Sequence, residues 1–230
     1  SAPIGSGHRL AAEALEQAFA DRSEVKVIHG NIFDFFPQFL GKSFLGTYLW
    51  ILKCCPWLYK LAYSWGNKQG GSLWLRELLN RLLARLGGSY LRSVQPDAVI
   101  ATHATPAGII GYYKKQHPKL WLGAVVTDFT IHRWWVCDGV DTYFIADELL
   151  RDKLNTDADI QATGIPVRQQ FMIKHDKQKC REFFGWDENE RVCLLMGGGE
   201  GLLPMAEIIA ALQRAALKNL RVVAVTGHNE

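Results

Sequence analysis

The chain alternates between segments whose apolar residues have helical spacing and short apolar runs typical of buried strands. Residues 9–19, rich in Ala and Leu, are predicted to form a helix, and the alternating residues 24–28 a strand. Helices are also predicted at 45–63 and 72–91. In the second of these, leucines recur every three or four residues with arginines between them, which is typical of an amphipathic helix.

Strands and helices alternate regularly in the middle of the chain. Short apolar runs at 97–101, 120–126 and 142–146 suit the buried strands of a parallel sheet. Helices are expected to follow two of them, at 106–116 and 147–155. This order predicts an α/β fold of the doubly wound, Rossmann-like type.

The same pattern starts again near the C-terminus. A strand, a glycine-rich loop, a helix and a second strand are predicted at 191–196, 197–201, 204–218 and 220–226. We therefore expect an N-terminal domain at 1–166, a linker at 167–190 and the start of a second domain at 191–230. Two strands cannot close a core, and the first glycine loop has no strand before it, so both ends are expected to be truncated.

The first eight residues form a glycine-rich segment directly before the first predicted helix. Gly5 and Gly7 allow a tight turn and a close approach of the backbone to a ligand. His8 lies where unpaired N–H groups at a helix start favour anions and disfavour an imidazolium. A neutral His that faces a bound hydroxyl is a candidate general base. The alternative is an ordinary glycine-rich turn with an exposed His.

Three polar residues follow the predicted strand at 120–126, at the carboxyl end where α/β proteins bind ligands. Asp128 is a candidate for binding a ligand hydroxyl and for supporting His8, and Thr127 and His132 are candidate acceptor-binding residues. The alternative is a turn or capping Asp with a solvated His. His132 has no second ligand at metal spacing, so no metal site is predicted.

The second glycine-rich loop has adjacent N–H groups near a helix start, a combination suited to a diphosphate. Its candidate residues are Gly197, Gly198, Gly199, Glu200 and Gly201. A tight structural turn is the alternative. Two glycine loops, each opening an α/β domain, indicate a ligand held between the domains.

Composition and charge narrow the class of protein. A hydrophobic content of 48% is that of a globular protein, and a net charge of +3 does not indicate nucleic acid. Five cysteines without a Cys-x-x-Cys spacing predict buried thiols in a reducing cytosol rather than zinc or disulfides. The uncharged run at 43–52 is much shorter than the ~20 residues of a membrane-spanning helix.

Residues 33–92 carry a net charge of +6, from eight Lys or Arg against two acidic residues, and many of the aromatic rings. Trp and Tyr favour the membrane–water interface, and Lys favours anionic headgroups, so this segment is predicted to contact a membrane surface. The rings can also pack on the sheet or bind single-stranded nucleic acid, but the helical pattern favours the membrane. The predicted membrane-contact residues are Trp50, Lys53, Trp57, Tyr59, Lys60 and Trp65.

In order and spacing, these motifs resemble the monogalactosyldiacylglycerol synthase and processive diacylglycerol glucosyltransferase family, in glycosyltransferase family 28. The resemblance covers essentially the whole chain. Its motifs are the glycine loop at 1–8, Pro96-Asp97, the Thr102-His103 pair, Thr127-Asp128-Phe129 with His132, the segment 135–146, residues 163–166 and the loop at 196–201.

The resemblance implies a GT-B fold, in which an N-terminal domain takes the lipid acceptor and a C-terminal domain takes a UDP-sugar. It implies that His8 deprotonates the diacylglycerol hydroxyl, which attacks the anomeric carbon with inversion as UDP leaves. The loop at 197–201 would face the diphosphate, and no metal or other cofactor would be needed beyond UDP-glucose or UDP-galactose as co-substrate. The protein would act peripherally on the cytoplasmic face of a membrane.

The chain also departs from the family pattern. The donor-domain region that resembles the nucleotide-recognition site of related enzymes is absent, so the 230-residue chain alone is predicted to be inactive. A related transferase that glycosylates a polyprenyl-diphosphate lipid in wall synthesis is a second interpretation. A non-catalytic lipid- or nucleotide-binding module is a third.

Overall fold

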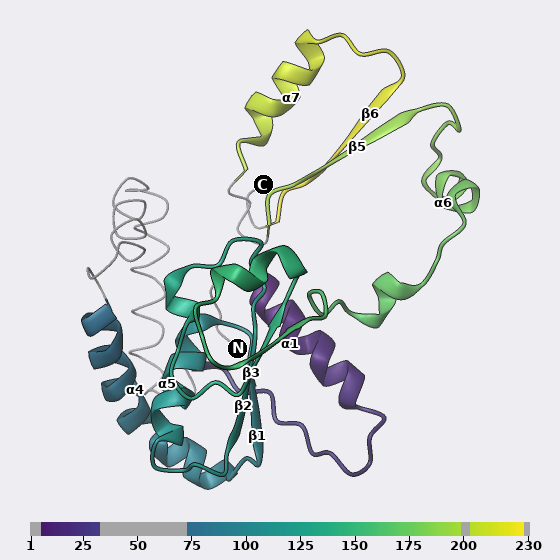
Figure 1. Ribbon diagram of the computed structural model, residues 1–230. Coiled ribbons are helices and arrows are strands. Elements are labelled where there is room, and N and C mark those ends of the chain that lie inside the picture. Colours follow the sequence, from purple (N-terminus) through teal and green to yellow (C-terminus); the bar gives the residue numbers. More distant parts are fainter. Residues whose placement is uncertain (1–5, 33–72, 199–202, 228–230) are drawn as a thin grey trace. The chain divides into compact units, whose positions relative to one another are not determined.

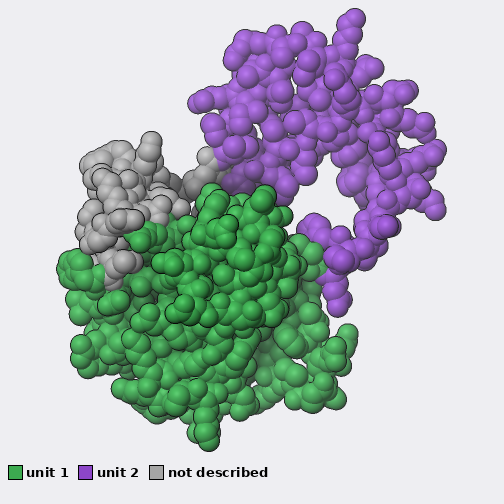
Figure 2. Space-filling model, in the orientation of Figure 1, with its two compact units in different colours: residues 1–168 green, residues 169–230 purple. Residues whose placement is uncertain are grey.

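The structure is a computed structural model that describes residues 6–32, 73–198 and 203–227. The chain divides into two compact units, residues 1–168 and 169–230, coloured separately in Figure 2. Each unit is described by itself below.

Unit 1 is built on a parallel sheet of four strands in the order β1-β2-β3-β4 (Figure 1). The strands are β1 (Ala98–Ala101), β2 (Trp121–Val125), β3 (Thr142–Ile145) and β4 (Asp159–Ala162). The centre of the sheet is the core of the unit, with Leu122, Tyr143 and Ile145 all completely buried. Strands β1, β2 and β3 agree with the apolar runs of the sequence, β4 was not predicted, and the predicted α/β class with parallel sheets is confirmed.

The helices of unit 1 form layers on the two faces of this sheet. Helix α5 (Ala104–Lys114) packs on β1 and β2, and α4 (Leu73–Val94) packs on α5. In Figure 1, α4 and α5 lie on one side of the sheet and α1 (Ser6–Phe19) lies on the other. A Cβ at Gly111 would lie 2.1 Å from the Asp138 carbonyl oxygen, so glycine is what lets α5 pack so closely on the segment before β3.

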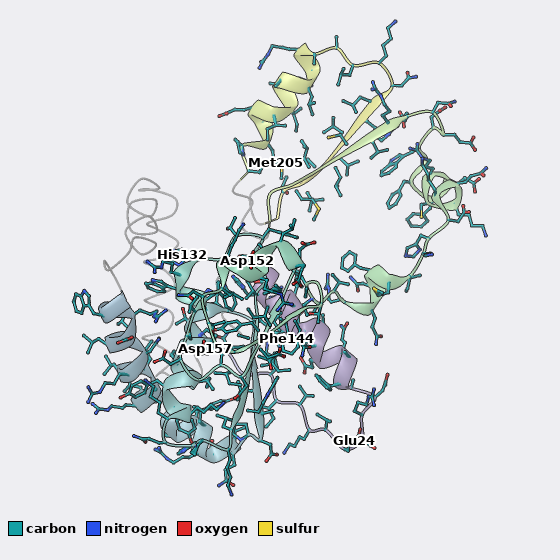
Figure 3. All side chains as sticks on the ribbon, in the orientation of Figure 1. Glu24, His132, Phe144, Asp152, Asp157 and Met205 are labelled. Atoms are coloured by element: carbon teal, nitrogen blue, oxygen red, sulfur yellow. The ribbon has the colours of Figure 1, made fainter. Side chains whose placement is uncertain are left out.

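Two predicted elements of unit 1 differ from the structure. The strand predicted at 24–28 is wrong: this stretch is an irregular segment after α1, where Figure 3 labels Glu24. Its residues Val25, Val27 and Ile28 are 39–48% exposed. An alternating segment forms a strand only where a neighbouring strand takes up its backbone hydrogen bonds. The helix predicted at 147–155 is a 3₁₀ helix, η3 (Glu148–Lys153), capped by the Asp147 side chain.

Unit 2 contains a second parallel strand pair, β5 (Arg191–Met196) and β6 (Leu220–Val225), connected through helix α7 (Met205–Arg214). The 3₁₀ helix η4 (Gln169–Met172) and helix α6 (Lys177–Phe184) precede them, in a stretch predicted to be a linker. Helix α6 begins at the capping side chain of Asp176 and ends at Gly185, which adopts the left-handed conformation that favours glycine.

Candidate functional site

His8 belongs to the first turn of a helix rather than to a loop. Helix α1 begins at Ser6, so Gly7 and His8 are both helical, whereas the sequence predicted the helix from residue 9. Gly7 has ordinary helical geometry, and a Cβ built on it meets nothing within 4 Å. The expected tight turn at Gly7 is therefore wrong, because the first helical turn continues through it. Gly5 lies outside the described residues.

The His8 ring is held by residues at the carboxyl ends of two neighbouring strands. Its Nδ1 lies 2.9 Å from the carbonyl oxygen of Thr102, after β1, and 2.6 Å from Oγ1 of Thr127, after β2. A carbonyl oxygen can only accept a hydrogen bond, so Nδ1 carries the ring proton and donates it. Nε2 is then the basic nitrogen of the neutral ring.

Burial and a nearby charge shift the pKa of His8 in opposite directions. Burial lowers the pKa of His8 below its ordinary value of 6.5, while the Asp128 carboxylate and the hydrogen bond to Thr102 oppose the shift. The imidazole is therefore neutral at pH 7. The nearby carboxylate also means that a proton taken up by Nε2 would be stabilised.

A second histidine, His103, packs edge-on against His8, with 4.5 Å between the ring centroids. It caps helix α5, because its Nδ1 accepts a hydrogen bond from the Thr105 backbone N–H at 3.1 Å. Burial, and then the neighbouring His8, lower the pKa of His103 to about 3, so this ring is a neutral hydrogen-bond acceptor. His103 belongs to a motif of the family resemblance but was not predicted as a site residue, although it follows a buried strand just as Thr127 and Asp128 do.

A buried aromatic pair orients Asp128. The indole Nε1–H of Trp135 donates to Oδ2 of Asp128 at 2.9 Å, and Trp135 is 1% exposed. The Tyr143 hydroxyl donates to the Trp135 carbonyl oxygen at 2.8 Å and accepts from the Cys137 backbone N–H at 2.9 Å. The Asp128 carboxylate is thus held by a hydrogen-bonded chain that begins in the core of the sheet.

His132 lies on the connection between β2 and β3, where Figure 3 labels it. Its Nδ1 accepts from the Trp134 backbone N–H at 3.2 Å, which caps the 3₁₀ helix η2 (Arg133–Trp135). The structure thus joins Thr127 directly to His8 and gives His132 a capping bond. An acceptor-binding role for either residue stays a prediction.

The glycine loop of unit 2 lies only partly within the described residues. Gly197 and Gly198 follow β5, and Gly198 has a φ of 71°, in the left-handed region. Gly199, Glu200 and Gly201 lie outside the described residues. Helix α7 begins a few residues further on, at Met205, which Figure 3 labels. The diphosphate-binding role of this loop stays a prediction.

The predicted membrane-contact residues, from Trp50 to Trp65, also lie outside the described residues. Within the described ranges, no helix is both long and apolar enough to span a bilayer. In that same part of the chain, no group of three His, Cys, Asp or Glu side chains is arranged to hold a metal ion.

The sequence of unit 1 matches a known family. Residues 8–167 match the model of the monogalactosyldiacylglycerol (MGDG) synthase family, so the chain belongs to that family. The matched region begins at His8 and includes every residue of the His8 cluster described above.

Similar proteins among curated sequences are processive diacylglycerol beta-glucosyltransferases. Those of Bacillus pumilus, Bacillus licheniformis and Bacillus cereus are 27%, 26% and 28% identical to this chain. Each alignment covers the whole of this chain and 60% of the relative, so the chain spans about three-fifths of their length.

Proposed function

We propose that this chain is the acceptor side of an inverting glycosyltransferase, which moves a hexose from a UDP-sugar to the hydroxyl of diacylglycerol. Family membership and the names of the similar proteins support this reaction class. The observation that carries the proposal is the hydrogen bond from Nδ1 of His8 to the Thr102 carbonyl oxygen. It leaves a neutral ring whose Nε2 can take a proton.

In the proposed mechanism, Nε2 of His8 accepts the proton of the diacylglycerol hydroxyl as the oxygen attacks the anomeric carbon. The bond between the sugar and UDP breaks on the opposite face, which inverts the configuration. Asp128 stabilises the imidazolium that forms, and Trp135 keeps the carboxylate in place. Backbone N–H groups of the loop at 197–201 hold the charge of the departing diphosphate without a metal.

The decisive test is the exchange His8→Gln in the full open reading frame that contains this sequence. Loss of a general base is expected to lower kcat by roughly 10²–10⁴-fold, with little change in vesicle binding. The control is His175→Gln, an exposed histidine of unit 2, which should leave kcat unchanged. Full activity of the His8 variant would contradict the assignment.

The acceptor is tested in the same assay. Transfer to diacylglycerol is expected, and transfer only to a polyprenyl-diphosphate lipid would favour the wall-synthesis interpretation. Ligand binding without any transfer would favour a binding module. We also propose that the 230-residue chain alone does not transfer sugar, which measurable turnover of a UDP-sugar by the purified chain would contradict.

We further propose that unit 1 lies against an anionic membrane surface on the cytoplasmic face. The support within the described residues is an exposed apolar row on α4 formed by Trp74, Leu78, Leu82 and Leu86, which recur every four residues and are 50–62% exposed. Arginines lie between these residues, as in helices that lie in the plane of a membrane interface. Exchange of Leu78 and Leu82 for Ser should lower binding to anionic vesicles in flotation, and unchanged binding would contradict the orientation.

A further inference from the structure

A groove of about 180 Å³ lies between α4 and α5, away from the His8 cluster. Its walls include Arg85, Gly88 and Arg92 of α4, and Tyr112, Tyr113 and Gln116 at the C-terminal end of α5. His103 caps the other end of α5, so at 1.5 Å per residue the groove and the His8 cluster are separated by roughly 12 Å along the helix. The groove is therefore a separate feature of unit 1.

The two arginines share one face of α4 with a glycine between them. The positions of Arg85, Gly88 and Arg92 follow the spacing i, i+3, i+7, which places them in line on a helix. Gly88 is buried, and a Cβ built on it would lie 3.0 Å from Nη1 of Arg92. The guanidinium of Arg92 thus occupies the space that a side chain at residue 88 would take, and Gly88 forms a notch in the groove.

Among the described residues, no acidic side chain neutralises the positive charge of this groove. No carboxylate lines it, and within the described part of the chain neither Arg85 nor Arg92 forms an ion pair. The nearby Lys114 and Lys115 differ, because they pair with Asp141 and Asp138. Both arginines line the same groove, and an anion bound in it would be attracted by both guanidiniums.

The chemistry of the lining selects the kind of anion. Guanidinium groups donate pairs of parallel hydrogen bonds that match the oxygens of a phosphate, and the tyrosine hydroxyls and the glutamine amide add neutral donors. A volume of about 180 Å³ is several times the ~30 Å³ of a water molecule, which leaves space for a phosphate with a short alcohol attached.

We propose that the groove between α4 and α5 binds a phosphate group through Arg85 and Arg92. The group can belong to a lipid headgroup or to a soluble phosphate compound, and both would present the same oxygens to the two guanidiniums. This site does not depend on the proposed transferase activity, and its test needs no turnover.

The test compares two double variants of the 230-residue chain that have the same net charge. Arg85→Gln with Arg92→Gln removes the groove arginines, and Arg81→Gln with Lys119→Gln removes two exposed charges elsewhere in unit 1. Inorganic phosphate and glycerol 3-phosphate are titrated while the arginine Nε–H signals are followed by NMR. The groove variant should lose roughly tenfold or more in affinity, and the control less than about twofold.

A third variant tests shape rather than charge. Gly88→Ala keeps both arginines but adds a methyl group to the notch, so phosphate affinity should fall several-fold while the helix is retained. Circular dichroism confirms that each variant is folded. The proposal would be overturned if phosphate affinity were unchanged in Gly88→Ala and fell equally in the two double variants. That result would show that only the overall charge of the protein matters.

Vesicles distinguish the two sources of the phosphate. Phosphatidylcholine vesicles with and without phosphatidic acid are compared by flotation. If the ligand is a headgroup, the groove variant loses binding to phosphatidic acid while the control keeps it. If the ligand is soluble, groove-dependent binding appears with glycerol 3-phosphate and the vesicles bind both variants alike. Equal binding of every probe to both double variants would overturn the proposal and leave the proposed transferase function untouched.

Discussion

Units 1 and 2 contain parallel strands of similar apolar content but differ in burial. Four of the five residues of β2 are buried, whereas β5 alternates between exposed and partly exposed residues. Strand β2 lies between β1 and β3 and is covered by α5, while within the described residues β5 pairs with β6 alone. Helices α6 and α7 have no buried residue. Parallel strands become core only when neighbouring strands and helical layers enclose them.

This difference bears on the candidate site. The His8 ring is held by groups from three elements, because α1 supplies the ring and the ends of β1 and β2 supply its partners. In the loop of unit 2, a Cβ on Gly198 would meet nothing within 4 Å. Unit 1 therefore holds a preorganised cluster, while the described part of the unit 2 loop has open space around it.

The largest expected effect compares matched leucines in the two sheets. Leu122→Ala in β2 removes a completely buried side chain and should lower the free energy of unfolding of unit 1 by about 2–5 kcal/mol. Leu194→Ala in β5 removes a side chain from a residue that is 56% exposed, and should cost less than about 1 kcal/mol. Native-state hydrogen exchange of the β2 and β5 amides measures the stability of each unit separately. Equal losses of stability in the two variants would contradict the difference in burial between the two sheets.

The second effect concerns the hydrogen bond that orients Asp128. Trp135→Phe leaves the carboxylate without its indole donor, which should destabilise unit 1 by about 1.5–3 kcal/mol in urea unfolding. The pKa of His8, measured by NMR titration, should fall, because the Asp128 carboxylate raises it. The value should approach the one measured in Asp128→Asn. Trp121→Phe, at a partly exposed indole of β2, is the control and should change neither quantity appreciably. An unchanged His8 pKa in Trp135→Phe would contradict the positioning role.

The third effect is a pH dependence of unit 1 stability. The pKa of His103 is about 3 in the folded protein and near 6.5 when unfolded, so the unfolded chain binds the extra proton between these values. The contribution of the neutral His103 to the free energy of unfolding is complete above pH 6.5. It is lost as the pH falls toward 3, by up to about 1.4 kcal/mol per pH unit. His103→Asn keeps a capping acceptor but cannot titrate, so its stability should fall less steeply. Parallel slopes for the two proteins would rule out this contribution.

The smallest effect compares the two glycine-rich segments. Gly7→Ala should stabilise unit 1 by about 0.5 kcal/mol, because Gly7 is helical and its Cβ position is free. Gly198→Ala should destabilise unit 2 by about 1 kcal/mol, because a φ of 71° disfavours a side chain. Thermal unfolding of both variants shows whether each substitution stabilises or destabilises its unit. Two changes of the same sign would show that Gly7 and Gly198 do not differ in backbone conformation.

Much of unit 1 follows from local patterns. The leucine spacing predicts α4, although Leu78, Leu82 and Leu86 are exposed. The apolar runs predict β1, β2 and β3, whose buried residues form the core of unit 1. Strand β4 was not predicted, because it lies at the sheet edge and its residues are mostly exposed. Helix α6 was missed for a similar reason, since none of its residues is buried. Its capping Asp176 and terminal Gly185 were the available signals.

Some residues of the candidate site could likewise be predicted from the sequence, and others could not. His8, Thr127 and Asp128 were selected because they lie at a helix start or follow a buried strand, and these positions are visible in the sequence. The same rule applied to the strand before Thr102 would have found His103. Trp135 had no such signal, because its hydrogen bond to Asp128 depends on how the segment after β2 folds back.

The sequence by itself determined the α/β class, the two glycine-rich segments and the family, because periodicity and motif order are local properties of the chain. Only the tertiary structure decided the state of His8. Its proton position depends on a carbonyl oxygen 94 residues away and on a hydroxyl 119 residues away. Its neutrality depends on burial, which is a property of the packed layers and not of any single segment.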